Sequence, residues 1–210
     1  MFINPCRRRF ARFAAAAGGA SLAVLVCAVG GCEGGGDNQA STRGATESAS
    51  AGGARDGSAS AGSLQAALGE NVVDASGRTI PASHFDGKEY VLFYSSAAWC
   101  GPCRAFTPKL VDFYNDHGGG GRFEVVFVSS DRNAQAASEY MRDYEMPWTM
   151  IPFEDERLEA AKEYRSGRGI PDLVAVDAES GEVIAASYVN GHYLGPQQVL
   201  AEMSRRLATN

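Results

Sequence analysis

Acidic residues are absent from the first 32 positions of this 210-residue chain. The segment has four basic residues near its start, Arg7, Arg8, Arg9 and Arg12, and continues as an apolar run from Phe13 to Gly31. A basic start followed by an apolar stretch predicts a secretion signal. A membrane-spanning helix is the weaker alternative, because the run is short for a span and rich in glycine and alanine.

Basic residues are outnumbered beyond position 32, because all 25 acidic residues lie there while four of the 19 basic residues do not. A nucleic-acid-binding protein needs a basic face that neutralises phosphate groups. The acidic balance of this part of the chain therefore argues against a nucleic-acid partner.

Cysteine and histidine are also scarce, with five and three residues respectively. The chain has one Cys-x-x-Cys pair, Cys100 and Cys103, and it has neither a second such pair nor two closely spaced histidines. Because a structural zinc ion takes four ligands, zinc is a poor alternative for this pair. A permanent structural disulfide is a second alternative to a redox role, but closing so small a loop would stabilise the fold little.

The stretch Trp99–Cys103 reads Trp-Cys-Gly-Pro-Cys and lies between a predicted buried strand at Tyr90–Tyr94 and a predicted helix. Two cysteines three residues apart on a helical turn are close enough to form a disulfide. A helix N-terminus lowers the pKa of a thiol, so Cys100 is predicted to be the attacking thiolate and Cys103 the resolving thiol. Pro102 suits the first helical turn.

These residues resemble the thioredoxin superfamily, and more narrowly its tryparedoxin and nucleoredoxin branch. The resemblance covers residues 70–190. Besides the cysteine motif it is carried by Phe93–Trp99, Met146–Trp148, Ile151–Phe153 and Gly169–Pro171. It implies an α/β, thioredoxin-like fold with a central mixed β-sheet flanked by helices. Tyr94 occupies the place where ordinary thioredoxins carry a buried acid.

The resemblance also implies how the site is built. Ile170 and Pro171 match the cis-proline loop that faces the cysteine pair, and Trp99 would shape the reactive edge. Gly101 and Pro102 between the cysteines match general thioredoxin reductants, whereas many members of the branch have two prolines there. No metal or organic cofactor is implied, because the dithiol of Cys100 and Cys103 is itself the redox group.

Asp172 departs from the family, which usually has threonine after the cis-proline. A carboxylate near the sulfur of Cys100 would raise the pKa of that thiol. The alternative is that Asp172 points into solvent and is screened.

The segment Val29–Cys32 resembles the lipobox of bacterial lipoproteins, in which the cysteine carries the lipid; an ordinary signal peptide is the alternative. Cleavage before Cys32 would remove Cys6 and Cys27. Residues 33–63 are rich in glycine, alanine and serine and predict a flexible tether. The predicted division is a signal peptide at 1–31, the lipidated Cys32 with its tether at 32–63, and a thioredoxin-like domain at 64–210.

Together these features predict an exported, membrane-anchored lipoprotein that faces the periplasm or the cell exterior and acts as a protein thiol–disulfide oxidoreductase. A reductase is favoured, with protein disulfides as substrates and a membrane partner as electron donor. The alternatives are a disulfide oxidant or isomerase, and a binding lipoprotein whose disulfide is idle. A cytosolic tryparedoxin-like protein would require residues 1–32 not to be a signal.

Within the domain, apolar spacing predicts helices at 133–144, 155–165 and 196–207 and strands at 123–129 and 173–177. Asp131, which follows a strand, is predicted to cap the next helix. Trp148 is predicted to pack against the sheet. Pro108 should kink the helix that follows the cysteine motif.

Overall fold

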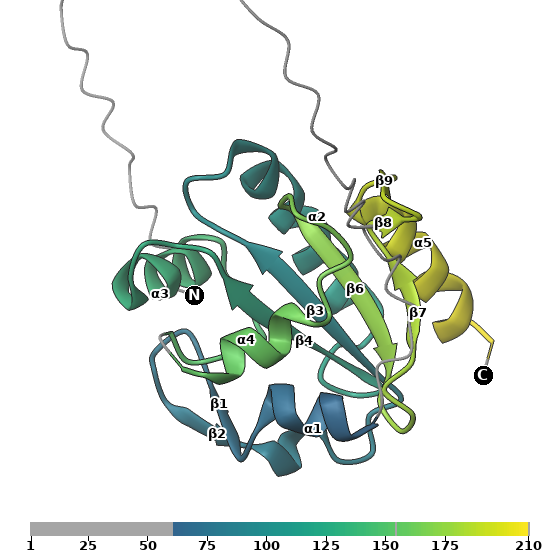
Figure 1. Ribbon diagram of the computed structural model, residues 1–210, viewed down its shortest axis with the longest axis horizontal. Helices are drawn as coiled ribbons and strands as arrows, with labels where there is room; N and C mark the ends of the chain where they lie inside the picture. Colours follow the sequence, from purple (N-terminus) through teal and green to yellow (C-terminus); the bar gives the residue numbers. More distant parts are fainter. Residues whose placement is uncertain (1–60, 154, 210) are drawn as a thin grey trace, which may run out of the picture. The chain divides into compact units, whose positions relative to one another are not determined.

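The computed structural model describes residues 61–153 and 155–209, which build a mixed β-sheet flanked by helices (Figure 1). The predicted signal peptide, Cys32 and nearly all of the predicted tether lie outside these residues. Seven strands form the sheet in the order β2-β1-β5-β4-β3-β6-β7. Their bounds are β1 Asn71–Val73, β2 Thr79–Pro81, β3 Tyr90–Ser96, β4 Phe123–Ser129, β5 Thr149–Met150, β6 Asp172–Asp177 and β7 Val183–Ala186. The predicted fold class is confirmed.

The central strands β3 and β4 are covered on both faces, and all but the first residue of β3 are buried. Their sequences are near-continuous runs of apolar residues, as expected of strands with no solvent-facing side. β3 pairs parallel with β4 and antiparallel with β6. The carboxyl end of β3 therefore lies beside the start of β6, and this juxtaposition positions the site.

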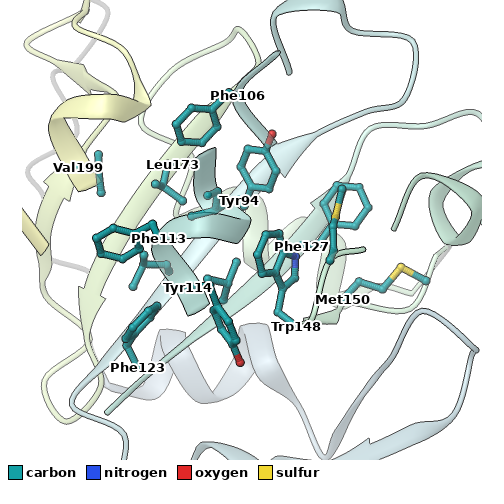
Figure 2. Packing of buried hydrophobic residues seen from close by; sticks show 14 of the residues in the cluster. Tyr94, Phe106, Phe113, Tyr114, Phe123, Phe127, Trp148, Met150, Leu173 and Val199 are labelled. Carbon is teal, nitrogen blue, oxygen red and sulfur yellow. The ribbon is translucent and has the colours of Figure 1, made fainter. Parts of the chain in front are cut away.

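Alternation of side chains along β3 and β4 divides the core into two clusters. Leu92, Tyr94 and Phe127 share one cluster with helices α2 (Gly101–Asp116), α3 (Ala134–Asp143) and α5 (Pro196–Leu207). Figure 2 shows the aromatic side chains that fill it. Trp148 lies among them and is only 2% exposed, which confirms that it packs against the sheet.

The second cluster covers the other face of the sheet. Val91 and Phe93 of β3 pack there with helices α1 (Ala61–Leu68) and α4 (Arg157–Lys162) and with the 3-10 helix η1 (Ala82–Phe85). Phe93 stacks on Tyr164, with ring centroids 4.6 Å apart. The strands β3 and β4 are thus covered by α2, α3 and α5 on one face and by α1, α4 and η1 on the other.

Several elements differ from the sequence-based prediction, among them the short η1 and β5, which were not predicted. The helix predicted at 155–165 is shorter, because the amide groups of residues 163–165 bond to carbonyls three residues back rather than four. A small second sheet, β8 (Tyr188–Val189) with β9 (His192–Tyr193), was not predicted. Asn190 and Gly191 turn between its strands with positive φ values, and this Asn-Gly pair is a recognisable hairpin signal.

Candidate redox site

Cys100 and Cys103 form a disulfide at the junction of β3 and α2, with their Cα atoms 5.2 Å apart. Cys100 is the N-cap residue of α2, and its sulfur accepts a hydrogen bond from the backbone N–H of Cys103 at 3.2 Å. The same N–H would stabilise a thiolate at Cys100 in the reduced state, together with the positive end of the helix.

The two cysteines differ in their access to solvent. Cys103 is completely covered, whereas Cys100 keeps 5% of its surface exposed, and Gly101 and Pro102 between them are exposed. Trp99 is 60% exposed, and its indole N–H donates to the carbonyl of Ser130 at 3.0 Å. An incoming molecule therefore reaches the pair from the side of Cys100 and Trp99.

The second wall of the site is the loop that leads into β6. The peptide bond between Ile170 and Pro171 is cis. The Ile170 side chain packs against the small cluster of Ala97, Cys100 and Cys103. Its carbonyl oxygen lies 3.7 Å from the sulfur of Cys100. The structure thus brings both segments singled out in the sequence, Trp99–Cys103 and Ile170–Pro171, into one site.

Asp131 holds the loop before Cys100, and its prediction as a helix cap is wrong. The cap of α3 is Asn133, whose side-chain oxygen accepts from the N–H of Ala136 at 2.8 Å. Asp131 instead accepts from the N–H of Ala98 at 2.8 Å and from the hydroxyl of Ser129 at 2.8 Å. The parallel pairing of β3 and β4 brings Ala98 close to Asp131, although they are 33 residues apart, so local spacing could not reveal this contact.

Four hydroxyl groups lie buried beneath α2. Thr107 donates to the carbonyl of Cys103 at 3.0 Å and also contacts the hydroxyls of Tyr94 at 2.8 Å and Tyr140 at 2.6 Å. Ser96 bonds to both tyrosines. Burial raises the pKa of Tyr94 well above its usual range, so this residue is a neutral hydrogen-bonding group. Thr107 and Tyr140 were not predicted as residues of the site. The available signal for Thr107 was its position four residues after Cys103 and directly before Pro108, where a threonine hydroxyl can bond to the carbonyl four residues back.

Asp172 lies at the start of β6 and is only 1% exposed, so the alternative that it points into solvent is wrong. Leu173 and Ala175 pack with α2, whereas Val176 packs with α4. Because strand side chains alternate, Asp172 faces the α4 side of the sheet. Its carboxylate accepts hydrogen bonds from the N–H and the hydroxyl of Ser166. Burial raises its pKa.

Two further properties concern the part of the chain that the structure describes. Within residues 61–153 and 155–209, no group of three or more His, Cys, Asp or Glu side chains is arranged to hold a metal ion. None of the helices in these ranges is both long and apolar enough to cross a membrane.

The chain is similar in sequence to known thioredoxin-like proteins. A family profile described as thioredoxin-like matches residues 87–183. Probable nucleoredoxin 1 of Arabidopsis thaliana is 43% identical over 102 residues, which cover 48% of this chain and 17% of that protein. Tryparedoxin of Trypanosoma brucei brucei is 38% identical over 95 residues, covering 45% of this chain and 65% of that protein. The chain thus spans less than two thirds of the length of these curated relatives.

A solved structure agrees with the sequence comparison. Tryparedoxin II from C. fasciculata superposes with a TM-score of 0.52 and is 38% identical in sequence. The match covers 60% of this chain and 84% of that protein.

Proposed function

The chain belongs to the thioredoxin-like family, and we propose that it is a thiol–disulfide oxidoreductase that reduces protein disulfides. The observation that carries this proposal is the Cys100–Cys103 pair at the N-terminus of α2, with the Ile170 carbonyl beside the more exposed sulfur. The similarity to nucleoredoxins and tryparedoxins supports the general class of reaction.

The proposed reaction begins with the reduced pair. The thiolate of Cys100 attacks one sulfur of a substrate disulfide, a bond forms between Cys100 and that sulfur, and the other substrate sulfur leaves as a thiolate that takes up a proton. Cys103 then loses its proton and attacks the sulfur of Cys100. The mixed disulfide breaks, the second substrate thiol is released, and the Cys100–Cys103 disulfide holds the oxidising equivalents.

The division of roles between the cysteines follows from their surroundings. Only Cys100 receives the N–H of Cys103 and retains exposed surface. Cys103 is enclosed, so it can react with a mixed disulfide at Cys100 but not with a separate protein. The dithiol carries two electrons by itself, so the proposal needs no metal or organic cofactor.

Reduction of insulin by dithiothreitol, followed as turbidity, tests the proposal. We expect the wild-type chain to accelerate the reaction and Cys100→Ser to abolish the acceleration. Cys103→Ser should accumulate a mixed disulfide, visible by mass spectrometry as a covalent adduct. Cys6→Ser is a matched control that removes a cysteine outside the proposed redox pair, and it should leave turnover unchanged. Absence of turnover by the wild type would favour a binding module whose disulfide is idle.

The direction of the reaction needs a separate measurement. A reductase requires a reduction potential well below that of an oxidant or isomerase, so equilibration of the pair with glutathione buffers distinguishes these alternatives. We expect a potential near the thioredoxin value of about −270 mV, whereas one near the DsbA value of about −120 mV would favour an oxidant.

A further inference from the structure

The loop between α4 and β6, residues 163–171, is held at several points by side chains that take no direct part in the proposed reaction. At one end, the N–H of Ser166 donates to Oδ2 of Asp172 at 2.8 Å, and the Ser166 hydroxyl donates to Oδ1. Two donors on one residue therefore converge on the two oxygens of one carboxylate, directly after the cis-proline.

The hairpin of β8 and β9 holds the same loop from outside. The N–H of Tyr188 donates to the hydroxyl oxygen of Ser166 at 3.0 Å. The hydroxyl of Tyr193 donates to the carbonyl of Pro171 at 3.2 Å. The Ser166 hydroxyl thus accepts from the hairpin and donates to Asp172, which joins hairpin, loop and β6 in one chain of hydrogen bonds.

Packing leaves the loop little room to move. A Cβ atom at Gly167 would lie 2.4 Å from a ring carbon of Tyr188, and one at Gly169 would lie 2.4 Å from its hydroxyl oxygen. The Arg165 guanidinium also donates to the carbonyl of Arg168 at 3.3 Å. The Tyr188 ring therefore packs closely against the backbone at Gly167 and Gly169, directly before Ile170.

We infer that Asp172 is a positioning residue of the redox site, which acts through Ser166 to hold the Ile170 carbonyl beside the sulfur of Cys100. The inference rests on the proposed function and deepens it. Each oxygen of the Asp172 carboxylate accepts from one donor of Ser166, whereas an asparagine in its place has a single acceptor oxygen, so one of these two donated hydrogen bonds is lost. Asp172 faces the α4 side of the sheet, so its effect on Cys100 passes through the loop backbone.

If Asp172 positions the loop, its replacement should slow the reduction of a protein substrate more than the reaction with a small dithiol. A protein substrate has to fit against the loop at Ile170, whereas a small dithiol such as dithiothreitol needs only to reach the sulfur of Cys100, the less buried of the two cysteines. Asp172→Asn should therefore lower kcat/KM for insulin at least about tenfold, the effect expected from losing one charge-assisted hydrogen bond, and mainly through KM. The rate at which dithiothreitol reduces the Cys100–Cys103 disulfide should change less than about twofold, because its attack bypasses the loop.

The chain offers a matched control on the same strand. Asp177 ends β6 and accepts hydrogen bonds from the N–H and the hydroxyl of Ser180, yet it lies at the end of the strand away from Cys100. Asp177→Asn removes a similar pair of contacts and should leave both rates unchanged. Ser166→Ala should reproduce the effect of Asp172→Asn, and Ser166→Thr, which keeps the hydroxyl, should restore most of the insulin activity.

Each outcome has one meaning. If Asp172→Asn and Ser166→Ala both reduce insulin as fast as the wild type, this inference is overturned and the proposed function stays intact. An equal loss toward insulin and dithiothreitol also overturns it, since a merely destabilised fold affects both reactions. If Asp172→Asn does not fold, the comparison of Ser166→Ala with Ser166→Thr decides whether the contact between residue 166 and Asp172 supports insulin reduction. Absence of turnover by the wild type overturns the proposed function and this inference with it.

Discussion

At the scale of single residues, Asp172 holds a carboxylate in surroundings that oppose its ionisation. Burial is the largest influence and raises its pKa, while the hydrogen bonds from Ser166 and the nearby charge of Arg165 act in the opposite direction. The position of Asp172 therefore combines a desolvation penalty with contacts that hold the loop at Ile170. Such a combination is expected where a residue serves a site at some expense of stability.

The pH dependence of stability tests whether burial or hydrogen bonding has the larger effect on the pKa of Asp172. Because the folded state raises the pKa above the reference value of 3.8, the contribution of Asp172 to stability is fully present below that value. It is lost as the pH rises through the folded-state pKa. We expect the difference in unfolding free energy between the wild type and Asp172→Asn to fall over this range, measured by urea unfolding at several pH values. A difference that increases with pH would mean that the Ser166 bonds outweigh burial.

At the scale of elements, the redox helix depends on the hydroxyl groups beneath it. Pro108 has no N–H, so the ordinary hydrogen-bond ladder of α2 is interrupted one turn after the cysteines. The carbonyl of Cys103 receives the Thr107 hydroxyl, and Thr107 in turn contacts Tyr94 and Tyr140. The cluster thus supports the first turn of α2, where both cysteines lie.

Thr107→Val tests this support, because it keeps the side-chain shape and removes one hydroxyl from the cluster. We expect the free energy of unfolding to fall by about 1–3 kcal/mol, since buried partners lose a hydrogen bond that water cannot replace. Urea unfolding measures the change. Thr149→Val is the matched control, because the buried Thr149 hydroxyl finds no partner among the residues that the structure describes. A loss at position 107 no larger than that at 149 would contradict the assigned role.

Elements that rest on local pattern were predictable from the sequence, and those that rest on distant contacts were not. The unit β3-α2-β4 follows from apolar runs and helical spacing, and the cysteine motif follows from its place between them. Asp131 was assigned to the wrong element because its partner, Ala98, lies far away in the sequence, in the turn after β3. Ser166 was not singled out, because nothing near it in the chain indicates that it binds Asp172 and the amide of Tyr188.

At the scale of the whole molecule, the proposed cycle needs a source of electrons. Each proposed turnover leaves Cys100 and Cys103 oxidised, and the export that residues 1–32 predict would place the protein in an oxidising compartment. A donor in the membrane would solve this problem if the domain stayed close to it. The segment between Cys32 and α1 is rich in glycine, alanine and serine. If this segment is the flexible tether that its composition predicts, its average reach is ~30 Å, and we propose that it presents the site to a membrane partner.

Membrane attachment through Cys32 is the last expectation to test. The acid-free start, the apolar run and the lipobox-like segment Val29–Cys32 motivate it. Stable attachment requires more than one acyl chain, which a lipidated N-terminal cysteine supplies. We expect Cys32→Ala to leave the membrane fraction or to remain unprocessed, measured by fractionation and by the mass of the mature chain. Cys27→Ala, within the predicted signal, is the matched control and should fractionate like the wild type. If Cys32→Ala and the wild type both stay with the membrane at the mass of the full, uncleaved chain, the apolar run itself is the anchor and the electron donor has to be sought beside a transmembrane helix.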